Sequence, residues 1–344
     1  MMLHIRWCRA FASAALFVAM LANPGRAADV YAGKAVDIIV GGAAGGGIDL
    51  YARLVSRRLG AHIAGNPNIL VKNMPGAGGT RSMQYVGAVA PADGMTIGAT
   101  APGAIVGPLL GEPGDATVDA SKFIYIGTTN VGVSICTTMD KSPIKTFSDA
   151  QNRPSTMGAQ GPGAPSFDVA LLVKNLAGAK FNIIPGYNGS THITLAMERG
   201  EVDGVCGWNW SGARAQKADW IRDKRLNLLA QIGIEEIPEL TEMGVPSIWG
   251  FIEGEDNRKV AAFVLTQKGF ERPLFIRDGT PAVRVQILRS AFDATMTDPN
   301  FLADAEKAGL EVSPSPGVRV QELVQGFYAT PKDIVEKARL AIKP

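Results

Sequence analysis

The sequence predicts an α/β fold of two domains, each built on a mostly parallel β-sheet flanked by helices. Short apolar runs alternate with helical patterns from Val36 onward, which is typical of parallel strands joined by helical crossovers. The length of 344 residues exceeds what one hydrophobic core usually serves, so two domains are expected. The content of Gly 40 and Pro 21 indicates many short loops between the elements.

The expected strands are short apolar runs, and the expected helices carry apolar residues at helical spacing. The helix after the first strand places Tyr51 and Leu59 on the face that packs, with Arg53 and Arg57 on the solvated face. The expected strands cover residues 36–40, 69–72, 95–99, 123–127, 133–137, 155–158, 181–184, 202–206 and 226–231. Helical patterns dominate after the prolines at 238 and 246, at residues 257–266, 281–297, 301–309, 318–328 and 331–342.

Residues 1–27 have the features of a secretory signal peptide. A short basic segment at residues 1–9 precedes an uncharged apolar run at residues 10–22, and small residues lead to the expected cleavage site. A retained transmembrane anchor is the alternative, but the apolar run is shorter than the roughly 20 residues that cross a bilayer. We therefore expect cleavage of residues 1–27 and export to the periplasm.

The charge balance argues against nucleic-acid or anionic-membrane partners. The full chain carries Lys+Arg 34 and Asp+Glu 32, a formal net charge of +2. Cleavage removes Arg6, Arg9 and Arg26 and no acidic residue, so the exported chain is slightly acidic. Nucleic acids and anionic bilayers are bound by strongly basic faces. No later segment is long and apolar enough to span a membrane, so we expect a soluble protein.

Two cysteines, Cys136 and Cys206, remain in the exported chain, and each lies in an apolar, strand-like run. They either pair as a disulfide in the oxidising periplasm or stay apart as two buried thiols, and the sequence does not choose between these. Two histidines, His62 and His192, and two distant cysteines are too few for a metal cluster. We expect no metal and no cofactor.

The glycine-rich segment between the first strand and the first helix is the most informative part of the sequence. Its small residues let backbone N–H groups turn toward an anion, and the helix that follows adds its positive end. A tight turn without a ligand is the alternative, although five glycines exceed what a turn needs. Asp49 fits a helix-capping role better than a ligand contact. The expected ligand contacts here are Gly42, Ala43, Ala44, Gly45, Gly46, Gly47, Ile48 and Asp49.

The same segment lacks the residues of two nucleotide-binding motifs. A Walker A loop ends in Gly-Lys-Ser or Gly-Lys-Thr, whereas Gly47 is followed by Ile48 and Asp49. A dinucleotide-binding loop needs an acidic residue at the end of the second strand, whereas this strand ends in Lys72 and Asn73. The sequence also has no Gly-x-Ser-x-Gly elbow for a nucleophilic serine, so we predict no catalytic residues and no enzyme.

Three further glycine-rich loops follow expected strands and open helices, at residues 73–80, 158–166 and 186–191. Ligands of open α/β sheets bind at the carboxyl ends of the strands, so these loops predict a binding crevice. Ser166 is the expected N-cap of the helix that starts at Phe167.

Asp203 is a polar residue within an apolar strand, and two tryptophans follow it. Trp208 and Trp210 either line the cleft or pack in the core. The expected ligand contacts outside the first loop are Thr100, Ala101, Gly161, Pro162, Gly163, Ala164, Ser166, Asn188, Asp203 and Trp208.

These motifs resemble the Bug family, the periplasmic receptors of tripartite tricarboxylate transporters. The family's opening pattern of a strand, Gly-Gly-Gly, Thr-Asp and Ala-Arg-Leu is matched by residues 40–49 and 52–54. Its Asn-x-Pro-Gly-Ala-Gly-Gly motif is matched at residues 73–79, and its Ala-Pro-x-Asp-Gly-x-Thr motif at residues 90–96. The resemblance extends over almost the whole exported chain.

The chain departs from the family pattern at three places. An aromatic residue usual in the first loop is replaced by Gly42, the threonine before the aspartate by Ile48, and a serine-histidine pair by Ser166 and Phe167. In the family these positions resemble ligand contacts, so the departures suit a larger or more apolar acid than a small dicarboxylate. Residues 251–275 also match the family poorly.

The resemblance implies a hinged, type II periplasmic-binding-protein fold with the ligand cleft between its domains. Residues 28–130 and 235–344 form the expected first domain, and residues 131–234 form the second. The family holds a ligand carboxylate on main-chain amides and ordered water of the first loop, while second-domain loops close over the other end.

The implied function is capture of a small organic carboxylate, which is a di- or tricarboxylate or an aromatic acid. The expected protein is a monomer that delivers this acid to the permease subunits of a tripartite tricarboxylate-type transporter in the membrane. A ligand-sensing subunit of a signalling system is one alternative. A periplasmic hydrolase or isomerase on the same scaffold is a less favoured one.

Overall fold

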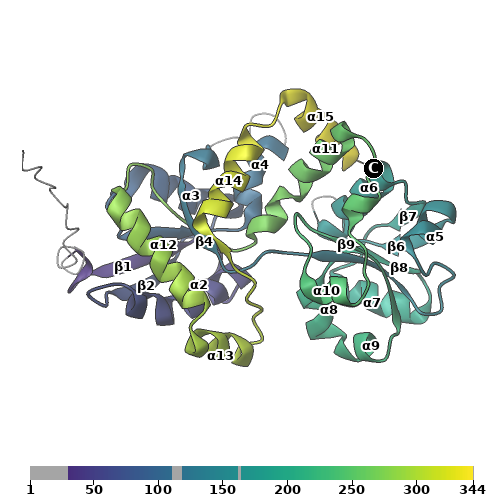
Figure 1. Ribbon diagram of the computed structural model, residues 1–344, viewed down its shortest axis with the longest axis horizontal. Helices are drawn as coiled ribbons and strands as arrows, with labels where there is room; N and C mark the ends of the chain where they lie inside the picture. The colour runs from purple at the N-terminus through teal and green to yellow at the C-terminus, as the bar shows by residue number, and fades with distance from the viewer. Residues whose placement is uncertain (1–29, 111–117, 162–163, 344) are drawn as a thin grey trace, which may run out of the picture.

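The protein consists of two lobes, and each is built around one β-sheet (Figure 1). The computed structural model describes residues 30–110, 118–161 and 164–343. The expected signal peptide, residues 1–27, and the expected ligand contacts Pro162 and Gly163 lie outside the described residues.

A six-stranded sheet forms the first lobe, in the strand order β11-β4-β10-β3-β1-β2. Its strands are β1 (Ala35–Val40), β2 (Asn68–Asn73), β3 (Thr96–Ala99), β4 (Ile124–Thr128), β10 (Pro273–Ile276) and β11 (Ser315–Pro316). β1 pairs in parallel with β2 and β3, whereas β10 runs antiparallel to β3 and β4. Because β10 runs antiparallel to both β3 and β4, strands β1 to β4 share one direction. β11 also runs antiparallel to β4.

A five-stranded sheet forms the second lobe, in the order β7-β6-β8-β5-β9. Its strands are β5 (Ser134–Met139), β6 (Ser155–Gly158), β7 (Phe181–Ile184), β8 (Gly204–Asn209) and β9 (Leu226–Ile232). β6 pairs in parallel with β7 and β8, whereas β5 runs antiparallel to β8 and β9. Two inner strands of the first sheet, β4 and β10, and one of the second, β5, therefore run against both of their neighbours.

Helices flank both sheets (Figure 1). In β1, Ile38 and Ile39 are both buried although they point to opposite faces, so helices cover the first sheet on two sides. The first-lobe helices are α2 (Gly47–Leu59), α3 (Thr80–Gln84), α4 (Pro102–Leu110), α12 (Ala282–Met296), α13 (Pro299–Lys307) and α14 (Gly317–Tyr328). The second-lobe helices are α5 (Phe147–Asn152), α6 (Pro165–Ala177), α7 (Ser190–Arg199), α8 (Trp210–Gln216), α9 (Ala218–Arg222) and α10 (Pro238–Glu242).

The last helix contacts both lobes. α15 (Lys332–Ala341) packs on α11 (Glu255–Leu265), on α4 of the first lobe and on α6 of the second. The Arg339 guanidinium donates to the Leu109 carbonyl at the end of α4, at 2.9 and 3.1 Å. Asn175 on α6 donates to the Ala341 carbonyl at 3.0 Å. The residue limits expected for the two domains stay a prediction, and α15 ties the end of the chain to both lobes.

The nine strands predicted from the sequence are all present, with small shifts at their ends, and the two-lobe α/β fold is confirmed. β10 and β11 were not predicted. β10 has four residues and begins at Pro273, and so short an apolar run does not distinguish a strand from a buried helix segment. The pairing within the sheets is mixed rather than mostly parallel. β5 enters its sheet directly from β4, without the helical crossover that makes neighbouring strands parallel.

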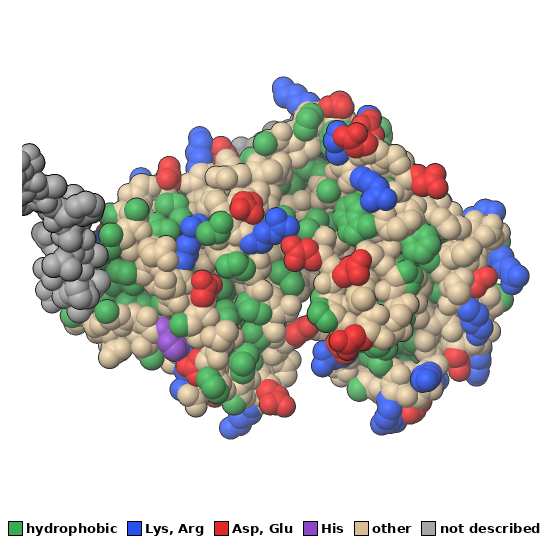
Figure 2. All heavy atoms as spheres, in the orientation of Figure 1, with side chains coloured by type: hydrophobic (Ala, Val, Ile, Leu, Met, Phe, Trp, Pro, Cys, Tyr) green, Lys and Arg blue, Asp and Glu red, His purple; other side chains and the backbone are tan. Residues whose placement is uncertain are grey.

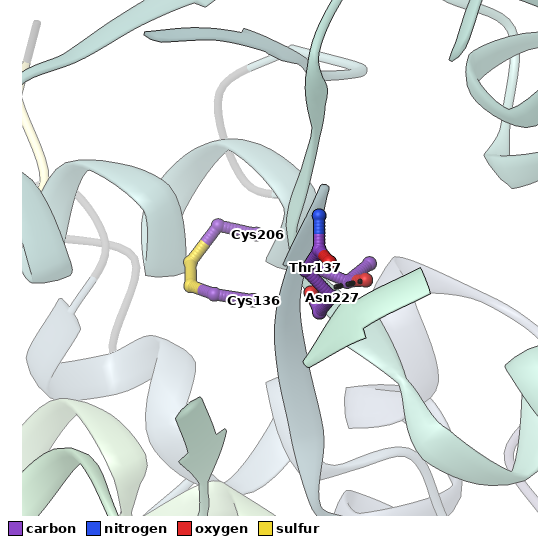
Figure 3. Close-up of a disulfide and its surroundings, with 4 residues drawn as sticks. All are labelled: Cys136, Thr137, Cys206 and Asn227. Carbon is purple, nitrogen blue, oxygen red and sulfur yellow. Dashed lines mark hydrogen bonds between the residues drawn. A yellow bond between two sulfur atoms is a disulfide. The ribbon is translucent and has the colours of Figure 1, made fainter. Parts of the chain in front are cut away.

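Cys136 on β5 and Cys206 on β8 are joined by a disulfide (Figure 3). The two residues are cross-strand partners in the antiparallel pair, and both are fully buried. Thr137 follows Cys136 and points to the other side of the sheet, where its hydroxyl donates to the Asn227 carbonyl on β9 at 3.0 Å (Figure 3). β5 is therefore fixed covalently to one neighbour and by a side-chain hydrogen bond to the other.

Replacing Cys136 and Cys206 together with alanine should lower the free energy of unfolding by roughly 2–4 kcal/mol, because the bond closes a long loop in the unfolded chain. Urea unfolding of the oxidised protein and of the variant measures the difference. Reducing agent should destabilise the wild type and leave the variant unchanged. Equal stability of the oxidised wild type and the variant would contradict a closed disulfide.

Candidate ligand-binding cleft

Residues of both lobes line one cavity of about 1000 Å³. This volume lies at the upper end of the range for small-molecule sites, about 300–1000 Å³. From the first lobe and the link to it the cavity is lined by Tyr51, Pro102, Val106, Asn130, Lys268 and Arg272. From the second lobe it is lined by Gln160, Ser166, Val205, Trp208, Asn209 and Gln216. Figure 2 shows side chains of both charge signs where the two lobes meet.

The buried carboxylate of Asp49 fixes the loop between β1 and α2 through hydrogen bonds. Asp49 is 1% exposed, and its carboxylate accepts hydrogen bonds from the Gly45 N–H at 2.8 Å, from Arg53 Nε at 2.8 Å and from Asn73 Nδ2 at 2.9 Å. The hydrogen bond from Arg53, with those from Gly45 and Asn73, lowers the pKa of Asp49 to about 2 against the opposing effect of burial. The carboxylate is thus ionised and already fully engaged. The role differs from the expected helix cap: Gly46 is the N-cap of α2, and Asp49 in the first turn binds back to the Gly45 N–H.

The loop itself faces solvent, with Ala43 to Gly47 exposed. The predicted contacts at residues 42–48 do not line the cavity, but Gly47 lies next to Arg272, which does. Gly45 has a φ of +79°, which a glycine adopts without strain. Gly46 is the N-cap of α2 and provides no side-chain hydrogen bond, so the first N–H groups of the helix have no capping side chain. A Cβ on Gly47 would lie 3.5 Å from Arg272 Nη2. The positive end of a 13-residue helix and a guanidinium therefore lie side by side.

Two of the contacts predicted in the second lobe, Ser166 and Trp208, line the cavity. Ser166 lies in the first turn of α6, whose N-cap is Ala164 and not Ser166 as predicted. Pro165 starts the helix because its fixed φ suits a first helical position. The Ser166 hydroxyl accepts the Gln160 N–H at 3.0 Å and so fixes the strand-to-helix loop.

The two tryptophans at the end of β8 have different roles. Trp208 is 4% exposed, lines the cavity, and its Nε1 has no hydrogen-bond partner among the described residues. Trp210 is buried in the second-lobe core, where its Nε1 donates to Glu239 at 2.8 Å. Trp208 therefore lines the cavity and also belongs to the second-lobe core, whereas Trp210 belongs to that core and does not line the cavity.

Asp203, a predicted ligand contact, does not line the cavity. It precedes β8, at the amino end of the strand, whereas the cavity is lined by the carboxyl ends. Its carboxylate accepts the Thr156 N–H and hydroxyl, each at 2.8 Å, and the Ser142 hydroxyl at 3.2 Å. A polar residue in an apolar stretch of sequence indicates a strand, but it does not show whether the residue lies at the amino or the carboxyl end of that strand.

The other predicted contacts that the structure describes do not line the cavity. The Thr100 side chain is buried beneath the two first-lobe glycine clusters, where a Cβ on Gly79 would lie 2.3 Å from its hydroxyl oxygen. Ala101 directly precedes α4, whose first turn lines the cavity. Gly161 and Ala164 shape the loop before α6, since the Ala164 N–H donates to the Gly161 carbonyl at 3.1 Å. Asn188 is exposed, and its carbonyl lies 2.8 Å from His192 Nδ1.

A polar network at the link between the lobes forms another part of the cavity wall. Lys268 Nζ lies 3.1 Å from Glu271 Oε1, and the two side chains are only 9% and 14% exposed. Asn209 at the end of β8 donates to both Glu271 oxygens, at 3.3 and 3.4 Å. A carboxylate of the first lobe is therefore shared between a lysine of its own lobe and an amide of the other.

The described residues give no sign of a metal centre or a membrane span. Among them, no group of three or more His, Cys, Asp or Glu side chains could hold a metal ion. In the same part of the chain, no helix is long and apolar enough to cross a membrane.

Replacing Asp49 with asparagine should lower the melting temperature at neutral pH, because the neutral side chain loses its charge-assisted bond to Arg53. The folded pKa of about 2 lies below the ordinary 3.8, so this stabilisation is present above about pH 4 and is lost as the pH falls toward 2. Thermal unfolding across pH should show a difference between the two proteins that is constant above about pH 5 and shrinks below it.

Asp37→Asn is the matched control, because it removes a partly exposed ion pair with Lys72 and should change the melting temperature little. An Asp49→Asn variant as stable as the wild type at neutral pH would contradict the role of Asp49 in holding the loop.

No family model matches the chain. A UPF0065 protein in the gbd 5′ region of Cupriavidus necator is 26% identical to it over 348 residues, which cover 96% of this chain and 95% of the relative. A UPF0065 protein in the TAR-I ttuE-ttuC′ intergenic region of Agrobacterium vitis is 28% identical over 238 residues, covering 64% of each chain.

Solved structures share the fold over most of its length. A TctC solute-binding protein from Polaromonas has a TM-score of 0.71 at 20% identity, covering 89% of this chain and 99% of its own. R. palustris Rpa4515 with adipate has a TM-score of 0.56 at 20% identity, covering 89% and 97%. MatC from Rhodopseudomonas palustris with bound malate has a TM-score of 0.51 at 21% identity, covering 90% and 99%. The resemblance seen in the sequence is thus confirmed, and the chain has the fold of the TctC/Bug solute-binding proteins.

Proposed function

We propose that this protein is a periplasmic solute-binding receptor that captures a small organic carboxylate between its two lobes and delivers it to a tripartite tricarboxylate-type transporter. The observation that carries the proposal is the cavity of about 1000 Å³ shared by the two lobes, which Arg272 lines on the first-lobe side, next to the uncapped start of α2. A helix N-terminus next to a guanidinium favours an anion over a neutral solute.

The similar structures support an organic acid as the ligand. One of them holds adipate and another holds malate, both of which are dicarboxylates. The apolar side chains Val106, Val169 and Val264 also line the cavity, which suits an acid with a hydrocarbon segment. Di- and tricarboxylates and aromatic acids are therefore the classes that we propose.

Capture follows from the division of the site between two lobes. An acid bound to one lobe alone makes half of its contacts, and it makes the rest only when the lobes approach each other. The closed state is therefore the one that the ligand favours, and its population rises with ligand concentration. The network of Lys268, Glu271 and Asn209 lies beside residues 129–133, which link the lobes. A change in lobe orientation would therefore alter the distances within this network.

Export and delivery complete the proposed function. The N-terminal 27 residues have the pattern of a cleaved signal peptide, and the Cys136–Cys206 disulfide suits an oxidising compartment. The exported monomer would then present its closed, loaded form to membrane permease subunits.

Thermal unfolding of residues 28–344 against a panel of acids tests the receptor function. We expect aliphatic dicarboxylates such as adipate to raise the melting temperature, because a ligand at 100 times its Kd stabilises the folded state by about 2.7 kcal/mol. Adipic diamide, which has the same length and no charge, is the control and should give no shift. The protein is first refolded from denaturant to remove any retained ligand. If no acid of the panel then raises its melting temperature, the proposal is contradicted.

A further inference from the structure

Two buried hydrogen-bond donors without partners belong to residues that line the same cavity from opposite lobes. Arg272 Nε, just before β10, and Trp208 Nε1, at the end of β8, are buried, and neither has a partner among the residues that the structure describes. Both residues line the cavity. A buried donor without an acceptor destabilises the folded protein, so two of them on residues that line one cavity favour a ligand with acceptors at two places.

Arg272 is held in one orientation by its surroundings. Its backbone N–H donates to Thr128 Oγ1 at 3.1 Å, and its Nη1 donates to the Glu271 carbonyl at 2.7 Å. The guanidinium lies over the Tyr51 ring, 5.3 Å from the ring centre, and the Tyr51 hydroxyl is itself fixed on the Glu311 carbonyl at 2.7 Å. Nη1 is thus engaged, while Nε and the edge near Gly47 are not used by the protein.

No acidic side chain within the described residues pairs with Arg272. Glu271, its neighbour in the chain, turns its carboxylate to Lys268 and Asn209. Asp49, on the nearby helix, is taken by Arg53, Asn73 and Gly45. Lys268 also lines the cavity, but Glu271 neutralises it. Among the described cavity-lining cations, Arg272 and the exposed Lys343 have no acidic partner, and Arg272 is the one that lies beside the start of α2.

Trp208 offers a donor of a different kind. Its indole packs in the second-lobe core with Ile135, Val205 and Ala213, and at 4% exposure it is held in place. Its Nε1 is a neutral donor, which suits a carboxylate or carbonyl oxygen without adding a second positive charge. Gly212 leaves room beside it, because a Cβ there would lie 3.8 Å from Nε1.

We propose that Arg272 anchors one carboxylate of the ligand, together with the first N–H groups of α2, and that Trp208 Nε1 binds an oxygen at the other end of the same molecule. A planar guanidinium binds the two oxygens of a carboxylate through parallel hydrogen bonds. The ligand class is an organic acid with a carboxylate at one end, a second oxygen acceptor at the other and an apolar segment between them. The inference rests on the proposed receptor function and adds the residues that select the ligand.

Titration calorimetry with adipate and hexanoate tests the inference, because these acids share a chain length and differ in the second carboxylate. Arg272→Gln should weaken both acids by roughly 10- to 100-fold, since both lose the charge-assisted bonds. Arg272→Lys should recover part of the affinity through its charge. Trp208→Phe should weaken adipate several-fold and leave hexanoate unchanged, because hexanoate has no oxygen to meet Nε1.

Arg277→Gln is the matched control. Arg277 directly follows β10, as Arg272 directly precedes it, and it donates to the Ala90 carbonyl away from the cavity. This variant should bind both acids as the wild type does, and far-ultraviolet circular dichroism checks that every variant is folded.

The outcomes separate the inference from the proposed function. A folded Arg272→Gln variant that binds adipate as tightly as the wild type would overturn the anchor while leaving the receptor function intact. A Trp208→Phe variant that binds both acids more weakly by the same factor would overturn the assignment of Trp208 Nε1 to the second oxygen acceptor of the ligand. A wild type that binds neither acid would overturn both the inference and the proposed class of ligand.

Discussion

The contacts of Asp49 are the interaction on which the candidate site depends. One buried carboxylate binds the Gly45 N–H of the first loop, Arg53 one turn further along α2, and Asn73 at the end of β2. These bonds join the first loop, the first helix and the second strand into one unit, so the start of α2 has a fixed position. The Asp49 carboxylate is fully occupied by these hydrogen bonds. The loop can therefore present an uncapped helix end to an anion without presenting a negative charge.

The two lobes both contribute the remaining groups of the candidate site. The first lobe supplies positive potential from α2 and Arg272, and the second supplies Ser166 and the Trp208 donor. The Lys268–Glu271 pair lies at the junction, largely buried, and Asn209 of the second lobe completes it. Loss of either charged partner would leave a largely buried charge without compensation, so the pair fixes the geometry of the link as well as closing the cavity wall. At the far side α15 contacts both lobes through α4 and α6.

Most of the fold could be predicted from the sequence because its signals are local. Apolar runs located the nine strands, and the spacing of glycines located the first loop beside α2. Arg272 and Tyr51 could not be found in this way, because their contact joins β10 to α2 across more than 200 residues of chain. The position of Asp203 could not be predicted either, because its sequence context indicates a strand but not which end of the sheet it lies at. Trp208 was predicted as a contact and Trp210 was not, but the sequence left open whether each lines the cleft or packs in the core, since the two environments leave the same apolar pattern.

A crystal structure of the protein with a bound dicarboxylate such as adipate tests the central claim most directly, because it locates the ligand relative to both lobes. We predict one carboxylate within hydrogen-bond distance of the Arg272 guanidinium and the Gly47 N–H, and an oxygen of the other carboxylate within that distance of Trp208 Nε1. A ligand that contacts one lobe only, or that leaves both Arg272 and the start of α2 without a contact, would contradict a site shared between the lobes.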